Sequence, residues 1–196
     1  MSDFTAIRAI SLTLKELLKA NITDSTEPQL AGVAIELISP KEMQRAHEGV
    51  GVSVWLYRIT RNSDLLNEPP ERPQPNQLAH RALPLTLHYL ITPITDDPEA
   101  KHAILGRTLQ VLNDHAVLRG ADLQDTLMGS ADQFRVVLEA LTVDELARVW
   151  ESLEEDFQLS APYAVQVVRI DSDLEPVQAT PVTTKKTTYA QILSSS

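Results

Sequence analysis

Three runs of β-branched and aromatic residues constrain this chain more than any other feature of its sequence. They are residues 50–62 (VGVSVWLYRITRN), the run ALPLTLHYLIT from Ala82, and YAVQVVRIDS from Tyr163. Such composition is typical of β-strands, and we predict that the three runs form one sheet with two covered faces. Strict alternation along the first strand places Val52, Val54, Leu56 and Arg58 on one face, and Ser53, Trp55, Tyr57 and Ile59 on the other.

Three other segments show the 3.6-residue period of helices that pack one face on a core. The first covers residues 4–19, and the second follows Asp97, a good capping residue, and is expected to include the segment NDHAVL. The third is the best specified, because Thr142 and Glu145 match a capping box. Its apolar stripe is expected to reach Phe157.

Two further strands complete the predicted sheet. Residues 30–39 (LAGVAIELIS) form one that ends at Pro40, and residues 134–140 form another before the last helix. Gly106 lies inside the second helix, where glycine costs about 1 kcal/mol relative to alanine, which indicates a close approach to the sheet. The order of elements lacks the regular strand-helix alternation of a doubly wound sheet. We therefore predict an α+β fold, with a mixed β-sheet flanked by helices.

Two segments lack any core periodicity. Residues 63–84 contain Pro69, Pro70, Pro73, Pro75 and Pro84, which predicts a long loop, either an ordered contact arm or a mobile connection. Beyond Asp171 the sequence turns polar. We expect one domain over residues 1–171 and an extended tail over residues 172–196. The tail is either a flexible terminus or an arm that orders on a neighbour through Tyr189, Ile192 and Leu193.

The charge of the chain is unevenly distributed. It has 17 basic and 27 acidic residues, a net charge of -10, and residues 122–175 hold 3 of the basic and 13 of the acidic ones. A chain of this charge repels phosphate groups, so we expect neither nucleic acid nor membrane as a partner. The acidic stretch is either a solvated surface or a docking surface for a basic partner. Its candidate interface residues are Glu151, Glu154, Glu155 and Asp156.

Motifs of known chemistry are missing from the sequence. It contains no cysteine, no HExxH pair among its five histidines, and no GxSxG, GxxxxGK[ST] or GxGxxG motif. His88 lies within an apolar strand, where a satisfied core or interface histidine is expected. Residues 1–20 mix charged with apolar residues and do not match a secretory signal. We therefore expect no catalytic, metal or cofactor-binding residue, no cofactor and no enzymatic activity.

Several segments in the same order resemble one known family. They are AIRAISLTLKELL, VSVWLYRITRN, LPLTLHYLIT after the Pro-rich loop, HAILGRTLQVLNDHAVL, VLEALTVDELARVW and VVRIDS, and together they span residues 4–171. This pattern resembles the N-terminal domain of the cap, or tube/sheath terminator, proteins of phage-tail-like contractile injection systems of the virulence-cassette and antifeeding-prophage type.

The resemblance implies a tail-terminator-like fold and an interaction protein that carries no catalytic set. It implies a homohexameric ring that ends the inner tube and the contractile sheath, with the sheath protein and the inner tube protein as partners. Assembly is then expected in the bacterial cytoplasm, as part of a particle whose final location stays open. Two other readings stay open as well: a terminator or connector of a true phage tail, and a monomeric peptide-binding or regulatory module.

Overall fold

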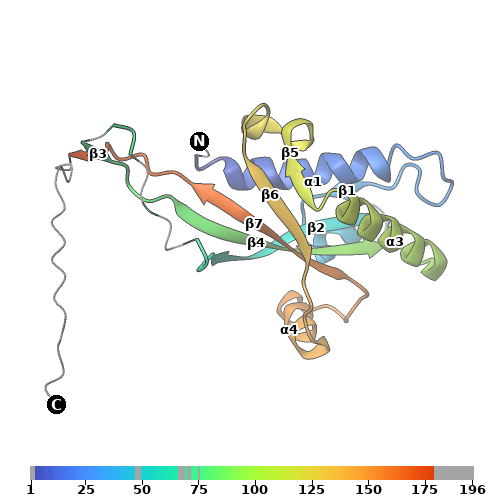
Figure 1. Cartoon of the computed structure of the whole chain (residues 1–196). Coiled ribbons are helices and arrows are strands. Elements are labelled where there is room, and N and C mark those ends of the chain that lie inside the picture. The colour runs from blue at the N-terminus through green and yellow to red at the C-terminus, as the bar shows by residue number, and fades with distance from the viewer. Residues whose placement is uncertain (1–2, 47–49, 66–68, 70–71, 75, 179–196) are drawn as a thin grey trace, which may run out of the picture.

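The computed structural model describes residues 3–46, 50–65, 69, 72–74 and 76–178 of the chain (Figure 1). Its elements in chain order are α1 (Ala6–Asn21), β1 (Ile35–Glu36), α2 (Pro40–Ala46), β2 (Gly51–Arg61), β3 (Gln77–Leu78), β4 (Leu83–Ile94), α3 (Pro98–Asp114), β5 (Val117–Arg119), the 3-10 turns η1 (Gly120–Asp122) and η2 (Asp125–Leu127), β6 (Gln133–Leu138), α4 (Val143–Leu153), β7 (Ala161–Ile170) and β8 (Val177–Gln178). Six strands form a sheet in the order β1-β2-β4-β7-β6-β5. β1 runs parallel to β2 and the other neighbours pair antiparallel. The predicted α+β fold is confirmed.

The main core lies between one face of the sheet and the helices α1 and α3. Alternate residues of the central strands point into it, which gives this face the two-residue period expected of a strand against a core. The Tyr89 hydroxyl is buried there and lies 2.8 Å from Ser11 Oγ of α1, so its polar group is satisfied. The members of this core include Ile10, Leu14 and Leu18 of α1, Ile104 and Leu112 of α3, Leu87, Tyr89 and Ile91 of β4, Phe134 of β6, and Val165 of β7.

The opposite face of the sheet is covered by α2 and α4. Figure 1 shows α4 on the other side of the sheet from α1. α2 packs closely on β2, because Met43 is fully buried and its methyl carbon would lie 1.9 Å from a Cβ atom at Gly51. Gly51 is therefore a position where the absence of a side chain lets a helix approach a strand.

A β-bulge changes the predicted alternation of β2. The pairing with β4 shifts between Leu56 and Arg58, so that Tyr57 is the extra residue. Arg58 pairs with His88 and lies on the face covered by α4, whereas the sequence alternation placed it with Val54. One inserted residue reverses the parity of every residue after it, which is why the prediction for Arg58 was wrong and Ile59 turns to the α1 face.

Residues 30–40 were predicted in part incorrectly. Only Ile35–Glu36 pair as a strand, and Pro40 begins a helix. Glu42 closes a capping arrangement with Ser39, whose backbone amide donates to Glu42 Oε2 at 2.9 Å. The pattern Ser-Pro-Lys-Glu contains this signal, with proline at the first helical position, but the preceding apolar run favoured a longer strand.

Three smaller expectations were also wrong. α3 ends at Asp114, and the segment expected to continue it forms the edge strand Val117–Arg119. α4 ends at Leu153, so Phe157 lies beyond the helix and is 52% exposed. A Cβ atom at Gly106 would contact nothing within 4 Å, so this glycine does not serve a close approach to the sheet.

A second, two-stranded sheet joins the Pro-rich loop to the C-terminal segment. Gln77 and Leu78 of β3 pair antiparallel with Gln178 and Val177 of β8. In Figure 1 this ribbon lies at the far end of the extended strands β4 and β7, away from α3 and α4. The Pro-rich loop and the first part of the predicted tail are thus attached to each other.

Candidate interface site

Helix α4 carries the acidic surface that the sequence singled out, and its first turn is locally well determined. The Thr142 hydroxyl accepts a hydrogen bond from the Glu145 amide at 3.3 Å. The Glu145 carboxylate accepts from the amide and the hydroxyl of Thr142, both at 2.8 Å. The predicted capping box is therefore confirmed, and these hydrogen bonds, the backbone one first, lower the pKa of Glu145.

The four acidic candidates lie together around the C-terminal end of α4, but they are not equivalent. Glu151 is exposed on the helix, and Glu154 ends the helix with a left-handed backbone at φ 55°. Lys41 of α2 lies 3.7 Å from one carboxylate oxygen of Glu154 and 3.7 Å from one of Glu155. Lys41 therefore offsets part of their charge, whereas Glu151 and Asp156 remain exposed. Tyr189, Ile192 and Leu193 lie outside the described residues.

Only one residue anchors α4 by burial. Trp150 is buried, and its ring meets the ring of Phe157 edge-on at 6.3 Å between centroids. Val143 at the start of the helix is 72% exposed. Within the described part of the chain, Trp150 Nε1 has no hydrogen-bond partner, and such a group costs about 1–3 kcal/mol when buried. Leu146, Val149 and Leu153 are half-buried beside it, and a polar contact from Lys41 of α2 also contributes to the placement of α4.

A polar cluster around the buried His88 lies on the same face of the sheet. His88 of β4 is 6% exposed, and its Nδ1 atom lies 3.0 and 2.9 Å from the two carboxylate oxygens of Glu139. Its Nε2 atom lies 2.8 Å from Thr60 Oγ1. Arg58 Nη2 lies 3.2 Å from His88 Nδ1 and 3.9 Å from Glu139 Oε1. The expected satisfied histidine is confirmed, whereas its partners were not predicted.

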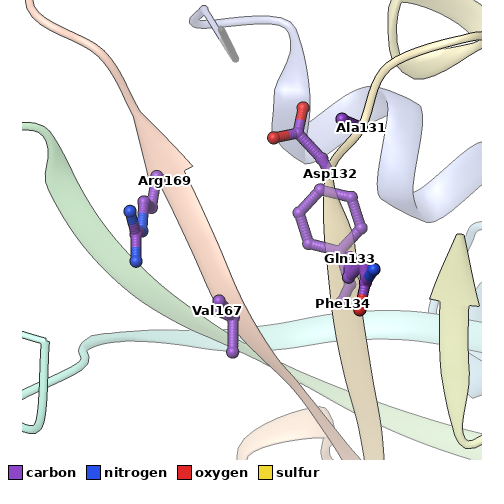
Figure 2. A pocket seen from close by; sticks show the side chains of 6 residues that line it. All are labelled: Ala131, Asp132, Gln133, Phe134, Val167 and Arg169. Atoms are coloured by element: carbon purple, nitrogen blue, oxygen red, sulfur yellow. The ribbon is translucent and has the colours of Figure 1, made fainter.

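A cleft lies where β6 separates from β7. Their pairing begins at Arg135 and Gln166, and next to it Val167 has a left-handed backbone with φ 68°. The cleft has a volume of about 250 Å³, and a more open hollow beside it, lined in part by Arg119 and Ser130, has about 480 Å³. In Figure 2, Arg169 and Val167 line the β7 side and the remaining residues the β6 side. The lining residues are Ala131, Asp132, Gln133, Phe134, Val167 and Arg169.

These features do not assemble a reaction centre in the part of the chain that the structure describes. The cleft contains neither a hydroxyl or thiol nucleophile nor a histidine. Across the described ranges, no group of three His, Asp or Glu side chains is arranged to hold a metal ion. None of the described helices combines the length and the apolar character of a membrane span. The site is best described as an acidic surface positioned by polar contacts.

Two solved structures share this fold. One is a sheath/tube terminator in the extended state from an extracellular contractile injection system, PVC, with 22% identity, a TM-score of 0.63, and coverage of 100% of this chain and 67% of that chain. The other is the tube-terminating cap of the anti-feeding prophage, with 22% identity, a TM-score of 0.62, and coverage of 92% and 60%. Among curated proteins the sequence has no significant match.

The family comparison covers nearly the whole described chain. A family model described as the Pvc16 N-terminal domain matches residues 9–184, which run from within α1 to beyond β8. This match confirms the resemblance inferred from the order of the sequence segments. The protein therefore belongs to the Pvc16 N-terminal domain family.

Proposed function

We propose that this protein is a cap of a contractile injection system, which ends the inner tube and the surrounding sheath. The observation that carries the proposal is the family match over residues 9–184. It is supported by a fold shared, over the full length of this chain, with a sheath/tube terminator. The chain spans 67% and 60% of the two solved proteins, so the role of their remaining parts is not transferred to it.

The mechanism proposed for such a cap is geometric. Six copies would form a closed ring, in which one side surface of each subunit meets a different side surface of its neighbour. Closure leaves no free lateral surface, and one axial face meets the last ring of the tube and sheath. The sheet offers little backbone for pairing between neighbours, since its edge strands β1 and β5 have two and three residues. Side-chain surfaces and the β3–β8 ribbon are therefore the proposed contacts.

The acidic end of α4 is the proposed axial docking surface. Glu151 and Asp156 are exposed and negatively charged, which suits a basic rim on the sheath or tube. The segment beyond β8, with Tyr189, Ile192 and Leu193, is proposed as a second contact. Assembly of the particle is proposed to take place in the bacterial cytoplasm, and the protein is proposed to act without catalysis.

Electron microscopy tests this function directly. Purified protein is mixed with isolated tubes and sheaths, and micrographs show where on them it binds. Mass photometry of the protein alone gives its oligomeric state. We expect ring-shaped particles and binding confined to the ends. A strict monomer that never binds a tube or sheath end would contradict the proposal, and a monomer that binds free peptides would favour a regulatory module.

A further inference from the structure

The cluster around His88 permits only some placements of the imidazole proton. Nδ1 lies within 3.0 Å of both Glu139 oxygens, which accept hydrogen bonds, and 3.2 Å from Arg58 Nη2, which only donates. A single ring nitrogen cannot accept from Arg58 and donate to Glu139 at the same time. The Thr60 hydroxyl at Nε2 does not discriminate, because it can donate or accept.

The Glu139 carboxylate favours one of the two positions of the ring proton, Nδ1 or Nε2. If Nδ1 carried a lone pair, it would face two carboxylate oxygens at hydrogen-bonding distance with no proton between them, and that repulsion would be buried. If Nδ1 carries the proton, it donates to Glu139, Nε2 meets Thr60, and Arg58 serves as an ion-pair partner of Glu139 at 3.9 Å. The geometry therefore favours a proton on Nδ1.

Glu139 lies in the chain between β6 and the start of α4, so a hydrogen bond to its side chain also affects where α4 begins. Glu139 follows β6 directly and precedes Thr142, the N-cap of α4, by three residues. Its backbone amide also donates to the Pro162 carbonyl of β7 at 2.9 Å. The first turn of α4 is otherwise exposed, with Val143, Asp144 and Glu145 all in contact with solvent.

We propose that His88, protonated on Nδ1, is the positioning residue of helix α4: by donating to Glu139 it fixes where the helix begins and thus where its acidic surface lies. At the other end, Lys41 contacts the last carbonyl of α4. The helix is then held at both ends by side chains from other elements, with Trp150 between them.

The charged or titratable groups around His88 and Glu139 come from β2 and α4. They are Arg58, Tyr57 and Glu145. Tyr57 is packed edge-on near His88, with 6.3 Å between ring centroids, and burial, followed by the charge of Glu139, raises its pKa. Arg58 is half-exposed and lies 5.8 Å from the Tyr57 ring, so it can balance the Glu139 charge without being desolvated.

Two substitutions of one residue separate the proposed role from simple packing. In His88→Asn the side-chain amide nitrogen occupies a place similar to Nδ1 and can still donate to Glu139. In His88→Gln the amide lies closer to the position of Nε2, so the donor to Glu139 is lost while a partner for Thr60 remains. A role in packing alone predicts similar effects for both, because both replace a ring by an amide.

The experiment combines NMR with amide hydrogen exchange on the full chain. ¹⁵N shifts of the His88 ring should show the proton on Nδ1. Amides of α4 should exchange about tenfold faster or more in His88→Gln and in Glu139→Gln, and within about threefold of wild type in His88→Asn, because only the first two variants lose the hydrogen bond to the carboxylate. Amides of α1, on the other face, serve as the internal reference.

The results that overturn the proposal are distinct from those that overturn capping. A neutral ring protonated only on Nε2 overturns it even if every variant fails to fold, and so do equal effects of the Asn and Gln variants on α4. The extension to docking rests on the proposed function and has its own measurement, the fraction of capped particles. Faster α4 exchange with unchanged capping supports the positioning role and refutes the acidic surface as the docking site.

Discussion

Lys41 of α2 donates a hydrogen bond to the backbone carbonyl of Leu153, the last residue of α4, at 2.8 Å. The two residues are 112 positions apart in the sequence. An ammonium group at this place satisfies a free carbonyl and interacts favourably with the negative end of the helix dipole. Glu154 and Glu155, which follow the helix, therefore lie near the same ammonium group that stabilises the helix end.

Replacing Lys41 should loosen the C-terminal end of α4. We expect Lys41→Met to lower the free energy of unfolding by about 1 kcal/mol, because the carbonyl of Leu153 loses its charged donor while the alkyl chain is kept. Urea unfolding measures the change in the free energy of unfolding, and amide hydrogen exchange shows which part of the chain is affected. Lys101→Met, at a half-buried lysine in the first half of α3 and away from a helix C-terminal end, is the control, and an equal loss in both variants would contradict the role given to Lys41.

Two glycines should respond to alanine in opposite directions. A Cβ atom at Gly51 would lie 1.9 Å from the Met43 methyl carbon and 3.0 Å from the Ala34 carbonyl oxygen. Gly51→Ala should therefore destabilise the protein by about 1–3 kcal/mol. Gly106→Ala, in an exposed helical position with free space, should stabilise it by about 1 kcal/mol. Thermal melting of both variants tests the pair, and a stable Gly51→Ala protein would refute the close packing of α2.

The first turn of α4 should weaken in acid. Because hydrogen bonds from Thr142 lower the pKa of Glu145 in the folded state, its contribution is present above the unfolded pKa and is lost as the pH falls through the folded one. NMR titration of the Glu145 carboxyl should show a midpoint below that of an unstructured glutamate. Thr142→Ala should recover only part of this difference, since the larger contribution comes from the backbone amide. A midpoint equal to that of a free glutamate would contradict the capping box.

Charge reversal should affect docking differently within the acidic cluster. Glu151→Lys with Asp156→Lys should lower the fraction of capped particles, more at low than at high salt, and should leave stability nearly unchanged, because both residues are exposed. Glu154→Lys with Glu155→Lys should also destabilise α4, since these residues lie near Lys41. Equal capping by the first variant and wild type at both salt concentrations would reduce the acidic surface to a solvated one.

Two deletions should distinguish the role of the segment beyond β8 from that of the β3–β8 ribbon. Removing residues 179–196 leaves β8 in place, whereas removing residues 176–196 also removes the partner of β3. Both should melt close to wild type, because the main core ends in β7. Limited proteolysis should cut near residues 76–80 faster only in the longer deletion. A large drop in melting temperature for either would show that the folded domain extends further than predicted.

Most of the fold follows from local sequence patterns. The strands β2, β4 and β7 were predicted from their composition, and α1, α3 and α4 from helical period and capping residues. Where the patterns failed, a tertiary contact decides. The bulge at Tyr57 depends on the register with β4, and the helix that begins at Pro40 packs on β2 through the contact of Met43 with Gly51.

The candidate site was predictable only in its local part. The acidic residues at the end of α4 are neighbours in sequence, so they were found together. Lys41 and the cluster of His88, Glu139 and Arg58 come from four different segments, and sequence spacing carries no signal for such pairs. Their contacts form only when the strands pair and α4 packs on the sheet. A single sequence contains no local motif for such contacts.

The ribbon of β3 and β8 also decides how mechanical load enters the molecule. Gln178 follows β7 along the chain and is hydrogen-bonded to the strand that leads into β4. β4 and β7 are the two central strands of the sheet, paired from Leu83 and Ile170 to Ile91 and Ala161. A pull on the chain beyond Gln178 would therefore act on β7 along the chain and, through the two residue pairs of the ribbon, on β4 as well.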